Sequence, residues 1–467
     1  MTPPTTSEAL SSRSARIHFI AIGGAVMHDL ALHLAQKGHQ VTGSDDEIYD
    51  PARASLAAQG LLPEQEGWYP EKITADLDAI ILGMHARPDN PELKRAQELG
   101  LTIYSYPDFI YENSRHKQRV VIAGSHGKTT ITSMVLHVLH HLKREVDYVI
   151  GAQVAALDGR VRLSDAPVIV IEGDEYLSSP IDRTPKILKY HHHIGLISGI
   201  AWDHYNVFPT MENYVEQFEQ FADNTPKGGN LIYCEEDDLA DMIGRKERPD
   251  VNAIEYRAHP YEVRDGTTYL LTDQGQLAIP LLGRHNMQNL SGALQICQRL
   301  GVTKEEFYEA IPSFTGASRR LELVAKNDTT VVYKDFAHAP SKLMATTQAV
   351  KSQFPDRTLV ACVELHTFSS LNREFIHQYQ GALKAADVGV VYHNPEVSRH
   401  KKLEPLTDDL IKEAFEQDDL EIFTDHQALL TFLQGTVGPG KNLLMMSSGT
   451  FGGIDLNALG QRATANP

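Results

Sequence analysis

Residues 124–130 have the types and spacing of a loop that binds the phosphates of a nucleotide. In such a loop the backbone N–H groups and the N-terminus of the following helix point at the anion. Lys128 places a positive charge near the β- and γ-phosphates, and the Thr129 hydroxyl can ligate Mg²⁺. The sequence therefore predicts an ATP site contacted by Gly124, Ser125, His126, Gly127, Lys128, Thr129 and Thr130.

The loop departs from the common GxxxxGK[ST] pattern, because Ile122 stands where the first glycine is expected. A glycine turn beside a surface lysine is the alternative interpretation. Residues 120–123 nevertheless read as a strand and residues 129–142 as a helix, which is the context that a phosphate loop requires. We therefore favour phosphate binding.

Polar residues follow two further predicted strands: Glu172-Gly173-Asp174-Glu175 after residues 168–171, and Asp203-His204 after residues 194–198. In open α/β sheets the carboxyl ends of strands face the crevice where nucleotides bind. Together with Thr129, Glu172 and His204 would offer ligands that suit one or two Mg²⁺ ions. Whether Glu172 or Glu175 faces the metal stays open. A solvated acidic turn and a structural histidine are the alternatives.

These residues need strands and helices to position them, and the first block of the chain, at about residues 16–112, supplies a βαβ unit. A strand at residues 17–22 ends in Gly23-Gly24, a helix follows at 26–37, and a second strand at 40–43 ends in Ser44-Asp45. Residues 79–83 read as another strand.

Two more blocks follow. The second contains the phosphate loop, an alternating polar and apolar stretch at 253–282 that predicts a small antiparallel insert, and a helix at 286–300. The third alternates helices with predicted strands at 331–333, 359–363, 389–392 and 443–446, as a parallel α/β domain does. The predicted fold class is α/β, with domains at residues 1–115, 116–314 and 315–467.

Composition limits the function classes. The 467-residue chain carries a net charge of −18, which disfavours general binding to nucleic acid or to an anionic membrane. Its three cysteines, Cys234, Cys297 and Cys362, are far apart, so disulfides and a cysteine-rich metal site are not expected. The N-terminal residues lack the apolar run of a signal peptide, and no long apolar run predicts a membrane span. A reducing cytoplasm fits best.

Six motifs follow one another along the chain: residues 124–130, Glu172, Asp203-His204, residues 285–289, Arg319-Arg320 and residues 335–340. In these motifs and their order the chain resembles, over nearly its whole length, the Mur ligase family, the ATP-dependent amide-bond ligases of bacterial cell-wall (peptidoglycan) synthesis. The resemblance accounts for the missing first glycine. It implies a Rossmann-like N-terminal domain, a central P-loop ATPase domain and a C-terminal Rossmann-like domain. It also implies that Asn286 and Asn289 bind adenine, that Arg320 and Asp335 complete the ATP site with Asp335 on the ribose, and that Glu172 and His204 bind Mg²⁺.

The first block resembles the uridine-diphosphate site of two family members. The matching segments are Gly23-Gly24-Ala25, followed by Met27, and Gly43-Ser44-Asp45. The implied UDP-sugar contacts are Gly23, Gly24, Ala25, Ser44, Asp45 and His85. Val26 and His28 stand where this loop usually has glycines, which predicts a tighter loop or a shifted pyrophosphate.

Of these two members, one adds L-alanine to UDP-N-acetylmuramate and the other adds the recycled tripeptide L-alanyl-γ-D-glutamyl-meso-diaminopimelate. The Phe451-Gly452-Gly453 run within residues 447–454, and residues 45–49, resemble the tripeptide-adding member more closely. Residues 364–372, where the amine substrate is expected, match neither pattern well. We therefore expect the tripeptide as acceptor, in peptidoglycan recycling, with L-alanine as the alternative.

The resemblance implies an acyl-phosphate mechanism. The muramyl carboxylate would attack the γ-phosphate of ATP beside Lys128 and Mg²⁺, and the amine would then displace phosphate. His204 or His338 could deprotonate the amine, and the spacing does not choose between them. The expected partners are ATP, UDP-N-acetylmuramate and a small peptide, without nucleic acid or membrane, and the expected assembly is a monomer or dimer.

Two alternative functions, an oxidoreductase and a non-catalytic scaffold, are also considered. An NAD-binding oxidoreductase is suggested by the Gly23-Gly24 turn with Asp45 about twenty residues later, but it leaves Lys128 and Glu172 unexplained. A degenerate ligase used as a scaffold is the other alternative. The intact Lys128, Thr129 and Glu172 argue against it.

Overall fold

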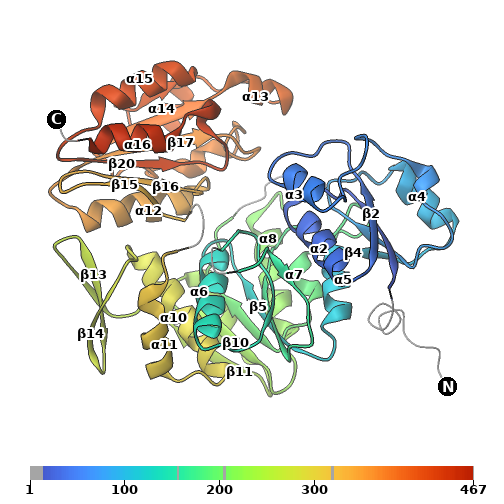
Figure 1. The fold of residues 1–467 in the computed structure, drawn as a ribbon. Coiled ribbons are helices and arrows are strands. Elements are labelled where there is room, and N and C mark those ends of the chain that lie inside the picture. Colours follow the sequence, from blue (N-terminus) through green and yellow to red (C-terminus); the bar gives the residue numbers. More distant parts are fainter. Residues whose placement is uncertain (1–13, 155–156, 203–206, 317–319, 466–467) are drawn as a thin grey trace. The chain divides into compact units, whose positions relative to one another are not determined.

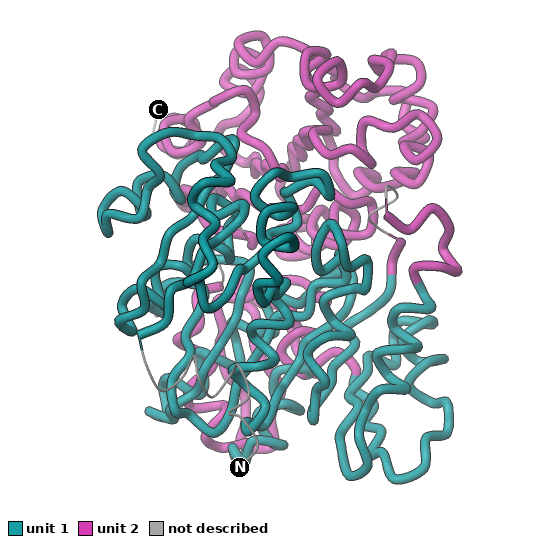
Figure 2. The backbone as a smooth tube through the Cα atoms, turned by 90° about the vertical axis from the view of Figure 1, so that its right-hand side faces the viewer, with its two compact units in different colours: residues 1–200, 215–256, 292–303 teal, residues 201–214, 257–291, 304–467 magenta. Residues whose placement is uncertain are grey.

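The computed structural model describes residues 14–154, 157–202, 207–316 and 320–465. The chain divides into two compact units, coloured separately in Figure 2. Unit 1 comprises residues 1–200, 215–256 and 292–303, and unit 2 comprises residues 201–214, 257–291 and 304–467. Each unit is built around sheets that end in candidate site residues.

The first sheet of unit 1 has four parallel strands in the order β2-β1-β3-β4. Its strands are β1 (Arg16–Ile20), β2 (Gln40–Ser44), β3 (Ala79–Leu82) and β4 (Ile103–Ser105). Its helices are α2 (Ala25–Gln36), α3 (Ala52–Ala58), η1 (Pro70–Lys72), α4 (Pro91–Glu98) and α5 (Tyr106–Asn113). β1 ends earlier than the predicted residue 22, because Ala21 turns the backbone into the left-handed region with a φ of 67°.

The second sheet of unit 1 has seven strands in the order β11-β10-β9-β5-β8-β6-β7, all parallel to their neighbours except β7. The strands are β5 (Gln118–Ala123), β6 (Asp147–Val149), β7 (Val161–Arg162), β8 (Val168–Glu172), β9 (Ile194–Ile197), β10 (Asn230–Cys234) and β11 (Asn252–Tyr256). The helices are α6 (Lys128–His141), α7 (Lys186–Lys189), α8 (Met211–Asp223) and α9 (Asp238–Arg245). The strands β5, β8 and β9 are nearly continuous apolar runs, as expected for parallel strands buried on both faces.

The antiparallel insert begins later than predicted. Its strands are β12 (Tyr261–Arg264), β13 (Thr267–Thr272) and β14 (Gly275–Ile279), whereas β11 is the parallel edge strand of the central sheet. Including residues 253–256 in the insert was wrong, because a half-exposed edge strand shows the same polar and apolar alternation as a hairpin. The Asp265-Gly266 turn joins β12 to β13 with φ values of 51° and 70°, the left-handed pair of a tight hairpin.

Unit 2 also contains a six-stranded sheet in the order β15-β16-β20-β17-β18-β19. Its strands are β15 (Glu322–Lys326), β16 (Val331–Asp335), β17 (Thr358–Leu365), β18 (Val388–His393), β19 (Glu421–Phe423) and β20 (Lys441–Met446). β15 is antiparallel to β16 and the remaining pairs are parallel, which confirms the expected α/β class and adds one antiparallel edge.

Helices cover both faces of this sheet (Figure 1). They are α12 (Pro340–Gln353), η3 (Ile376–Tyr379), α13 (Pro395–His400), α14 (Asp408–Phe415), α15 (His426–Thr436), η4 (Phe451–Gly453) and α16 (Leu456–Thr464). Alternate residues of β17 enter different cores: Val363 packs in one cluster and Cys362 in the other. The helices α10 (Arg284–Arg299) and α11 (Lys304–Ala310) and the turn η2 (Ile311–Ser313) precede the sheet in the chain.

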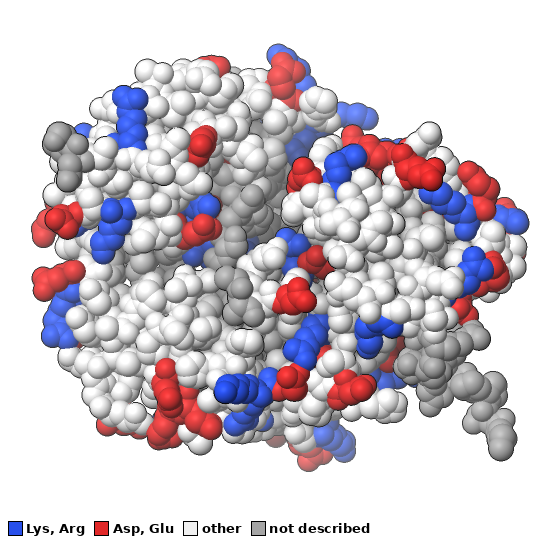
Figure 3. Space-filling view, viewed as in Figure 1, with Lys and Arg blue, Asp and Glu red and all other residues white. Residues whose placement is uncertain are grey.

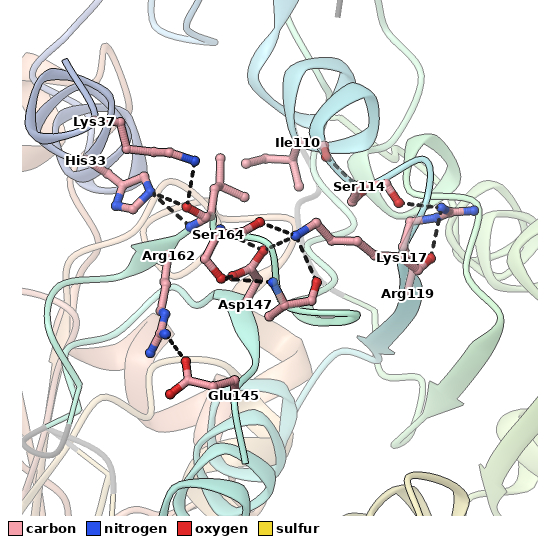
Figure 4. Close-up of polar contacts among 12 residues, drawn as sticks. His33, Lys37, Ile110, Ser114, Lys117, Arg119, Glu145, Asp147, Arg162 and Ser164 are labelled. Atoms are coloured by element: carbon pink, nitrogen blue, oxygen red, sulfur yellow. Dashed lines mark hydrogen bonds and ion pairs between the residues drawn. The ribbon is translucent and has the colours of Figure 1, made fainter. Parts of the chain in front are cut away.

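Two polar contacts connect α2 with the segment after β7, beside a separate buried ion pair (Figure 4). His33 of α2 lies with Nε2 2.9 Å from the carbonyl oxygen of Leu163, and the exposed Lys37, directly after α2, donates to the same oxygen at 3.1 Å. The Lys117 ammonium lies 2.5 Å from the carboxylate of the fully buried Asp147 and also donates to the carbonyls of Ser164 and Ala166. This buried charge pair is hydrogen-bonded and stabilises the segments around β6 and β7.

Candidate active site

The phosphate loop connects β5 to α6, as predicted. Gly124 and Gly127 have φ values of 130° and 80°, a region that side chains rarely adopt. A Cβ atom on Gly124 would also lie 2.1 Å from the Ser198 hydroxyl oxygen. Glycine at position 124 is therefore required by both backbone conformation and space, although the first glycine of the common pattern is absent.

The two residues that follow β9 stabilise the phosphate loop by hydrogen bonds. The Ser198 hydroxyl donates to the carbonyl of His126 and, at 3.2 Å, to that of Ala123. The Ser125 N–H donates to the carbonyl of Gly199 at 2.9 Å. Ser198 and Gly199 were not predicted as site residues. The signal that could have indicated them was their position at the end of the apolar strand predicted at residues 194–198.

Lys128 is half-enclosed at the start of α6. Its ammonium lies 2.7 Å from Oε2 of Glu175, whose side chain is 1% exposed, and it also donates to the carbonyl of Gly124. Burial lowers the pKa of Lys128, but the carboxylates of Glu175, Asp174 and Glu172 raise it further than burial lowers it. The lysine is therefore a fixed positive charge at the mouth of the loop, the property needed to bind phosphate oxygens.

Glu172 and Thr129 form the candidate metal-binding pair. The Thr129 hydroxyl donates to Oε1 of Glu172 at 2.6 Å, and the Gly151 N–H donates to Oε2 at 2.7 Å. This geometry separates the two glutamates, since Glu175 contacts Lys128 instead. A hydroxyl and a carboxylate oxygen are hard ligands that fit Mg²⁺.

Asp203 and His204 lie outside the described residues. Within the described residues no group of three or more His, Cys, Asp or Glu side chains is arranged to hold a metal ion. The roles of Thr129, Glu172 and His204 as Mg²⁺ ligands thus stay predictions, with Glu172 favoured over Glu175 by its contact with Thr129.

The predicted adenine-binding asparagines lie in the first turns of α10 and are nearly buried. The Asn286 amide donates to the carbonyl of Leu282 at 2.9 Å, and the Asn289 amide donates to the side-chain oxygen of Asn286 at 3.3 Å. Burial lowers the pKa of the adjacent His285 to about 4, so its ring is neutral at neutral pH. The asparagines therefore have a structural role at the helix start, and adenine binding remains a prediction.

In unit 2, residues 335–338 form a compact turn at the end of β16. The Asp335 carboxylate accepts from the N–H groups of Leu321 at 2.5 Å and Ala337 at 2.6 Å. Burial raises the pKa of Asp335 while Arg320 and the two N–H groups lower it, and the net direction is upward. The Arg320 guanidinium lies 5.2 Å from the centre of the Phe336 ring. Asp335 and Arg320 thus lie near each other, and their ATP-binding roles stay predictions, whereas Arg319 lies outside the described residues.

The predicted base His338 lies in the same turn. Its Nδ1 is 2.8 Å from the carbonyl oxygen of Phe336, and the Tyr379 hydroxyl donates to the carbonyl of His338. These contacts fix the backbone and the ring orientation. They do not identify the group that deprotonates the amine, so this role remains a prediction.

The predicted UDP-sugar residues gather at the N-terminus of α2. The Gly23 N–H donates to Oδ2 of Asp45 at 2.7 Å, and a Cβ atom on Gly23 would lie 2.9 Å from that oxygen. Gly24 is the residue before α2, and His85 is its neighbour, with a ring carbon 3.9 Å from the position of a Gly24 Cβ. Burial raises the pKa of Asp45 to about 6, although the Gly23 N–H lowers it.

Two features of this region were not predicted. Val26 and His28 lie inside α2, which begins at Ala25, one residue before the predicted helix start, and the tighter loop or shifted pyrophosphate expected from them stays a prediction. His28 is buried, and its Nδ1 is 2.8 Å from the carbonyl oxygen of Gly24. Ser44 is also buried, and its hydroxyl has no hydrogen-bond partner in the described part of the chain.

Residues 364–366, from the segment expected near the amine substrate, meet the 447–453 loop at the carboxyl edge of the unit 2 sheet. Oε2 of Glu364, at the end of β17, accepts from the Ser447 hydroxyl and, at 2.9 Å, from the Phe451 N–H. A Cβ atom on Gly449 would lie 2.7 Å from the same oxygen. His366 Nδ1 is 3.9 Å from the other oxygen. Glu364 therefore holds the 447–453 loop against β17.

On the face shown in Figure 3, lysine and arginine side chains are interspersed with aspartate and glutamate, without a broad surface of one sign. Among the described helices, none has both the length and the apolar character needed to cross a bilayer.

Three sequence models of one family match successive parts of the chain. The model "Mur ligase family, catalytic domain" matches residues 16–118, "Mur ligase middle domain" matches residues 122–297, and "Mur ligase, glutamate ligase domain" matches residues 319–449.

Relatives and solved structures point the same way. A UDP-N-acetylmuramate–L-alanine ligase of Arthrobacter sp. (strain FB24) is 31% identical over 403 residues, covering 84% of each chain, and further relatives carry the same name. The crystal structure of the UDP-N-acetylmuramate-alanine ligase of Thermotoga maritima shares the fold, with a TM-score of 0.69, 22% identity and coverage of 96% of this chain and 98% of that one.

A third protein has the tripeptide activity in its name. The UDP-N-acetylmuramate:L-alanyl-γ-D-glutamyl-meso-diaminopimelate ligase of Neisseria meningitides is 26% identical, with a TM-score of 0.58, over 65% of this chain and 98% of that one. The names of the relatives therefore favour L-alanine, the alternative acceptor, over the tripeptide expected from the sequence.

Proposed function

This chain belongs to the Mur ligase family of ATP-dependent amide-bond ligases, and from that premise we propose that it joins the carboxylate of UDP-N-acetylmuramate to the amine of an L-alanyl acceptor. Free L-alanine is the first candidate acceptor, because it is named in the activity of the 31%-identical relative. The domain boundaries 1–115, 116–314 and 315–467 are part of this proposal.

One observation carries the proposal: the phosphate loop, the Lys128 charge and the Thr129–Glu172 oxygen pair converge at the ends of β5 and β8. A carboxylate and an amine do not condense in water without activation, and transfer of the γ-phosphoryl group supplies that activation. The residues at this site offer backbone donors, a cation and metal-ligand oxygens, which are the groups that phosphoryl transfer requires.

The reaction has two steps. The muramyl carboxylate oxygen attacks the γ-phosphorus of ATP, the bond to the ADP oxygen breaks, and Lys128 stabilises the charge on the phosphoryl oxygens. The acceptor amine then attacks the carbonyl carbon of the acyl phosphate, phosphate leaves, and the amine loses a proton. A Mg²⁺ ion held by Thr129 and Glu172, with His204 as the predicted third ligand, would add positive charge at the phosphates.

The other predicted contacts keep their proposed roles. Gly23, Gly24, Ala25, Ser44, Asp45 and His85 bind the UDP-sugar, and Asn286, Asn289, Arg320 and Asp335 bind the adenosine of ATP. His204 or His338 accepts the amine proton. A reaction that consumes ATP and a nucleotide sugar suits the cytoplasm.

The tripeptide is the second candidate acceptor. It is favoured by the 26%-identical ligase from Neisseria meningitides and by the Phe451-Gly452-Gly453 run, whose Phe451 N–H is bonded to Glu364. Both acceptors present the amine of an L-alanine residue, so they would use the same phosphoryl-transfer site. They differ only in what must be accommodated beyond the alanine.

Phosphate release tests the proposal. The protein is supplied with ATP, Mg²⁺ and UDP-N-acetylmuramate, and then with either L-alanine or the tripeptide, with and without the nucleotide sugar. We expect phosphate only when sugar and acceptor are both present, and the more effective acceptor identifies the activity. MgATP binding without stimulation by either acceptor would instead support the scaffold reading.

A further inference from the structure

The acidic turn after β8 presents an electrostatic problem for the proposed ATP site. It carries three carboxylates within four residues, Glu172, Asp174 and Glu175, beside a loop that must accept a polyanion. Carboxylates this close in sequence repel one another and the phosphates, and the repulsion is strongest where water is excluded. A site that binds a triphosphate therefore needs a partner for each carboxylate.

The structure gives each carboxylate a different partner. Glu172 accepts from Thr129 and Gly151, and Glu175 pairs with Lys128. Asp174 pairs with Lys186, the first residue of α7, whose ammonium lies 2.5 Å from Oδ2 of Asp174. Lys186 was not among the residues singled out from the sequence, because an isolated lysine after a proline carries no motif.

Lys186 is built into the turn rather than lying on the surface. Its side chain is 12% exposed, and its ammonium lies 5.6 Å and 5.7 Å from the ring centres of Tyr106 and Tyr176. Burial lowers the pKa of Lys186, but Asp174 and Tyr106 raise it to about 12 overall. The lysine therefore stays charged at any pH at which the protein works.

Backbone hydrogen bonds also connect the acidic turn to the start of α7. The Lys186 N–H donates to the carbonyl of Tyr176 at 2.9 Å, and the Ile187 N–H donates to that of Asp174 at 3.2 Å. The Tyr176 N–H donates to the Asp174 carboxylate at 3.1 Å. Asp174 is thus held toward α7, while Glu172 and Glu175 on either side of it are bonded to Thr129 and Lys128.

We propose that Lys186 is a positioning residue for nucleotide binding: its charge neutralises Asp174, so that this carboxylate adds no net negative charge to the turn in which Glu172 contacts Thr129 and Glu175 contacts Lys128. This inference rests on the proposed function, because it assumes that the phosphate loop binds MgATP. Lys186 acts through the acidic turn and does not itself contact the nucleotide. Without the Lys186 ammonium, the Asp174 carboxylate would add net negative charge to the turn beside the phosphate loop.

The experiment measures equilibrium binding of MgATP to the full-length protein, together with the thermal unfolding temperature. The variants are Lys186→Met, Asp174→Asn and the double variant Lys186→Met/Asp174→Asn. Lys189→Met is the matched control, because Lys189 also lies in α7 and pairs with Asp182 and Asp108, away from the turn. Direct binding is used so that the result does not depend on the acceptor.

We expect Lys186→Met to weaken MgATP binding about tenfold, and the double variant to recover to within about twofold of the wild type. Asp174→Asn and Lys189→Met should each stay within about twofold. Recovery in the double variant is the distinguishing result, since a lysine that served only to pack α7 would not be replaced by removing a carboxylate.

Wild-type affinity in Lys186→Met, or equal weakening by Lys189→Met, would overturn the inference. Should Lys186→Met alone not fold, the double variant still decides, because it leaves no unpaired charge. Binding about tenfold weaker than wild type in a folded double variant would contradict the neutralising role. Absence of MgATP binding by the wild type would instead refute the proposed function.

Discussion

The phosphate-loop region of unit 1 and the carboxyl edge of the unit 2 sheet are built in the same way but differ in charge. In each, a glutamate at the end of a parallel strand holds neighbouring loops: Glu172 accepts from Thr129 and the Gly151 N–H, and Glu364 accepts from Ser447 and the Phe451 N–H. Beside Glu172 lies the Lys128–Glu175 ion pair, whereas Glu364 faces the imidazole of His366 at 3.9 Å.

We relate this difference to the ligands expected at the two regions: the ligand at the phosphate loop is always a nucleotide triphosphate, whereas the acceptor varies between enzymes. Any ATP-dependent enzyme must offer cations and backbone donors to the same triphosphate, so the residue types are dictated by the ligand. The two candidate acceptors are an amino acid and a peptide, and at the unit 2 edge, where we expect the acceptor to bind, Glu364 fixes the shape of the 447–453 loop. We therefore expect substitutions near Lys128 to affect phosphoryl transfer and substitutions near Glu364 to affect acceptor use.

The largest effect is expected from Lys128→Ala. Removal of the ammonium leaves the phosphoryl oxygens without their protein cation, so kcat should fall by about a thousandfold. Acceptor-dependent phosphate release measures the loss, and circular dichroism checks that the chain stays folded. Retained turnover in a folded variant would mean that the phosphate loop does not carry the chemistry.

A matched pair of substitutions, Glu172→Gln and Glu364→Gln, tests the comparison itself. Glu172→Gln removes a charged candidate ligand, so the Mg²⁺ concentration for half-maximal rate should rise about tenfold. Glu364→Gln should leave that concentration within about twofold but raise the KM for the acceptor about tenfold, because the 447–453 loop loses a charged hydrogen-bond acceptor. Titrations of Mg²⁺ and of acceptor on both variants measure the two effects. An effect of Glu364→Gln on Mg²⁺ dependence would contradict the separation.

Gly449→Ala tests the carboxyl edge of the unit 2 sheet without changing a charge. The added methyl group would lie 2.7 Å from the Glu364 carboxylate and 3.0 Å from the His366 ring, so the loop must shift. We expect the KM for the acceptor to rise about threefold to tenfold with an unchanged KM for ATP. Ala458, near the start of α16, offers a control: Ala458→Gly should leave both constants unchanged. Equal increases in both KM values for Gly449→Ala would indicate a general distortion.

The smallest effect is expected from Asp45, a third carboxylate at the end of a parallel strand. Asp45 follows β2 and accepts from the Gly23 N–H, and its pKa is raised to about 6 from a usual value of 3.8, mainly by burial. Since the folded state then binds a proton more tightly than the unfolded state, Asp45 lowers the free energy of unfolding as pH rises from about 4 to 6. Asp45→Asn should remove this dependence and raise the unfolding temperature at pH 7 by a few degrees, as measured by thermal melts across that pH range. A pH dependence equal to that of the wild type would show that Asp45 is ionised throughout.

Elements with a strong local sequence pattern could be predicted, and elements without one could not. Apolar runs that end in glycine or acidic residues predicted β1, β5, β8 and the phosphate loop, since burial and anion binding leave strong local patterns. The short strands β4, β6, β7 and β19 carry no such pattern and were not predicted. β11 was misassigned because an edge strand alternates in the same way as a hairpin strand.

Contacts between distant segments could not be predicted. Glu172 and Glu175 are equivalent in sequence, and only the fold shows that the first contacts Thr129 and the second Lys128. Ser198, Lys186 and Glu364 act through partners between 12 and 87 residues away, and no local motif records those pairings. The first turn of α2 begins one residue earlier than the pattern indicated, so Val26 and His28 lie inside the helix, and their effect on the UDP loop stays a prediction.

Activation of the muramyl carboxylate by phosphoryl transfer from ATP is the central step of the proposed reaction. The direct measurement uses UDP-N-acetylmuramate labelled with ¹⁸O in its carboxylate and follows the label by mass spectrometry of the released phosphate. Because the carbon–oxygen bond of an acyl phosphate breaks when the amine attacks, we predict one ¹⁸O atom in each phosphate formed from doubly labelled sugar. Unlabelled phosphate, released in step with amide formation, would contradict it.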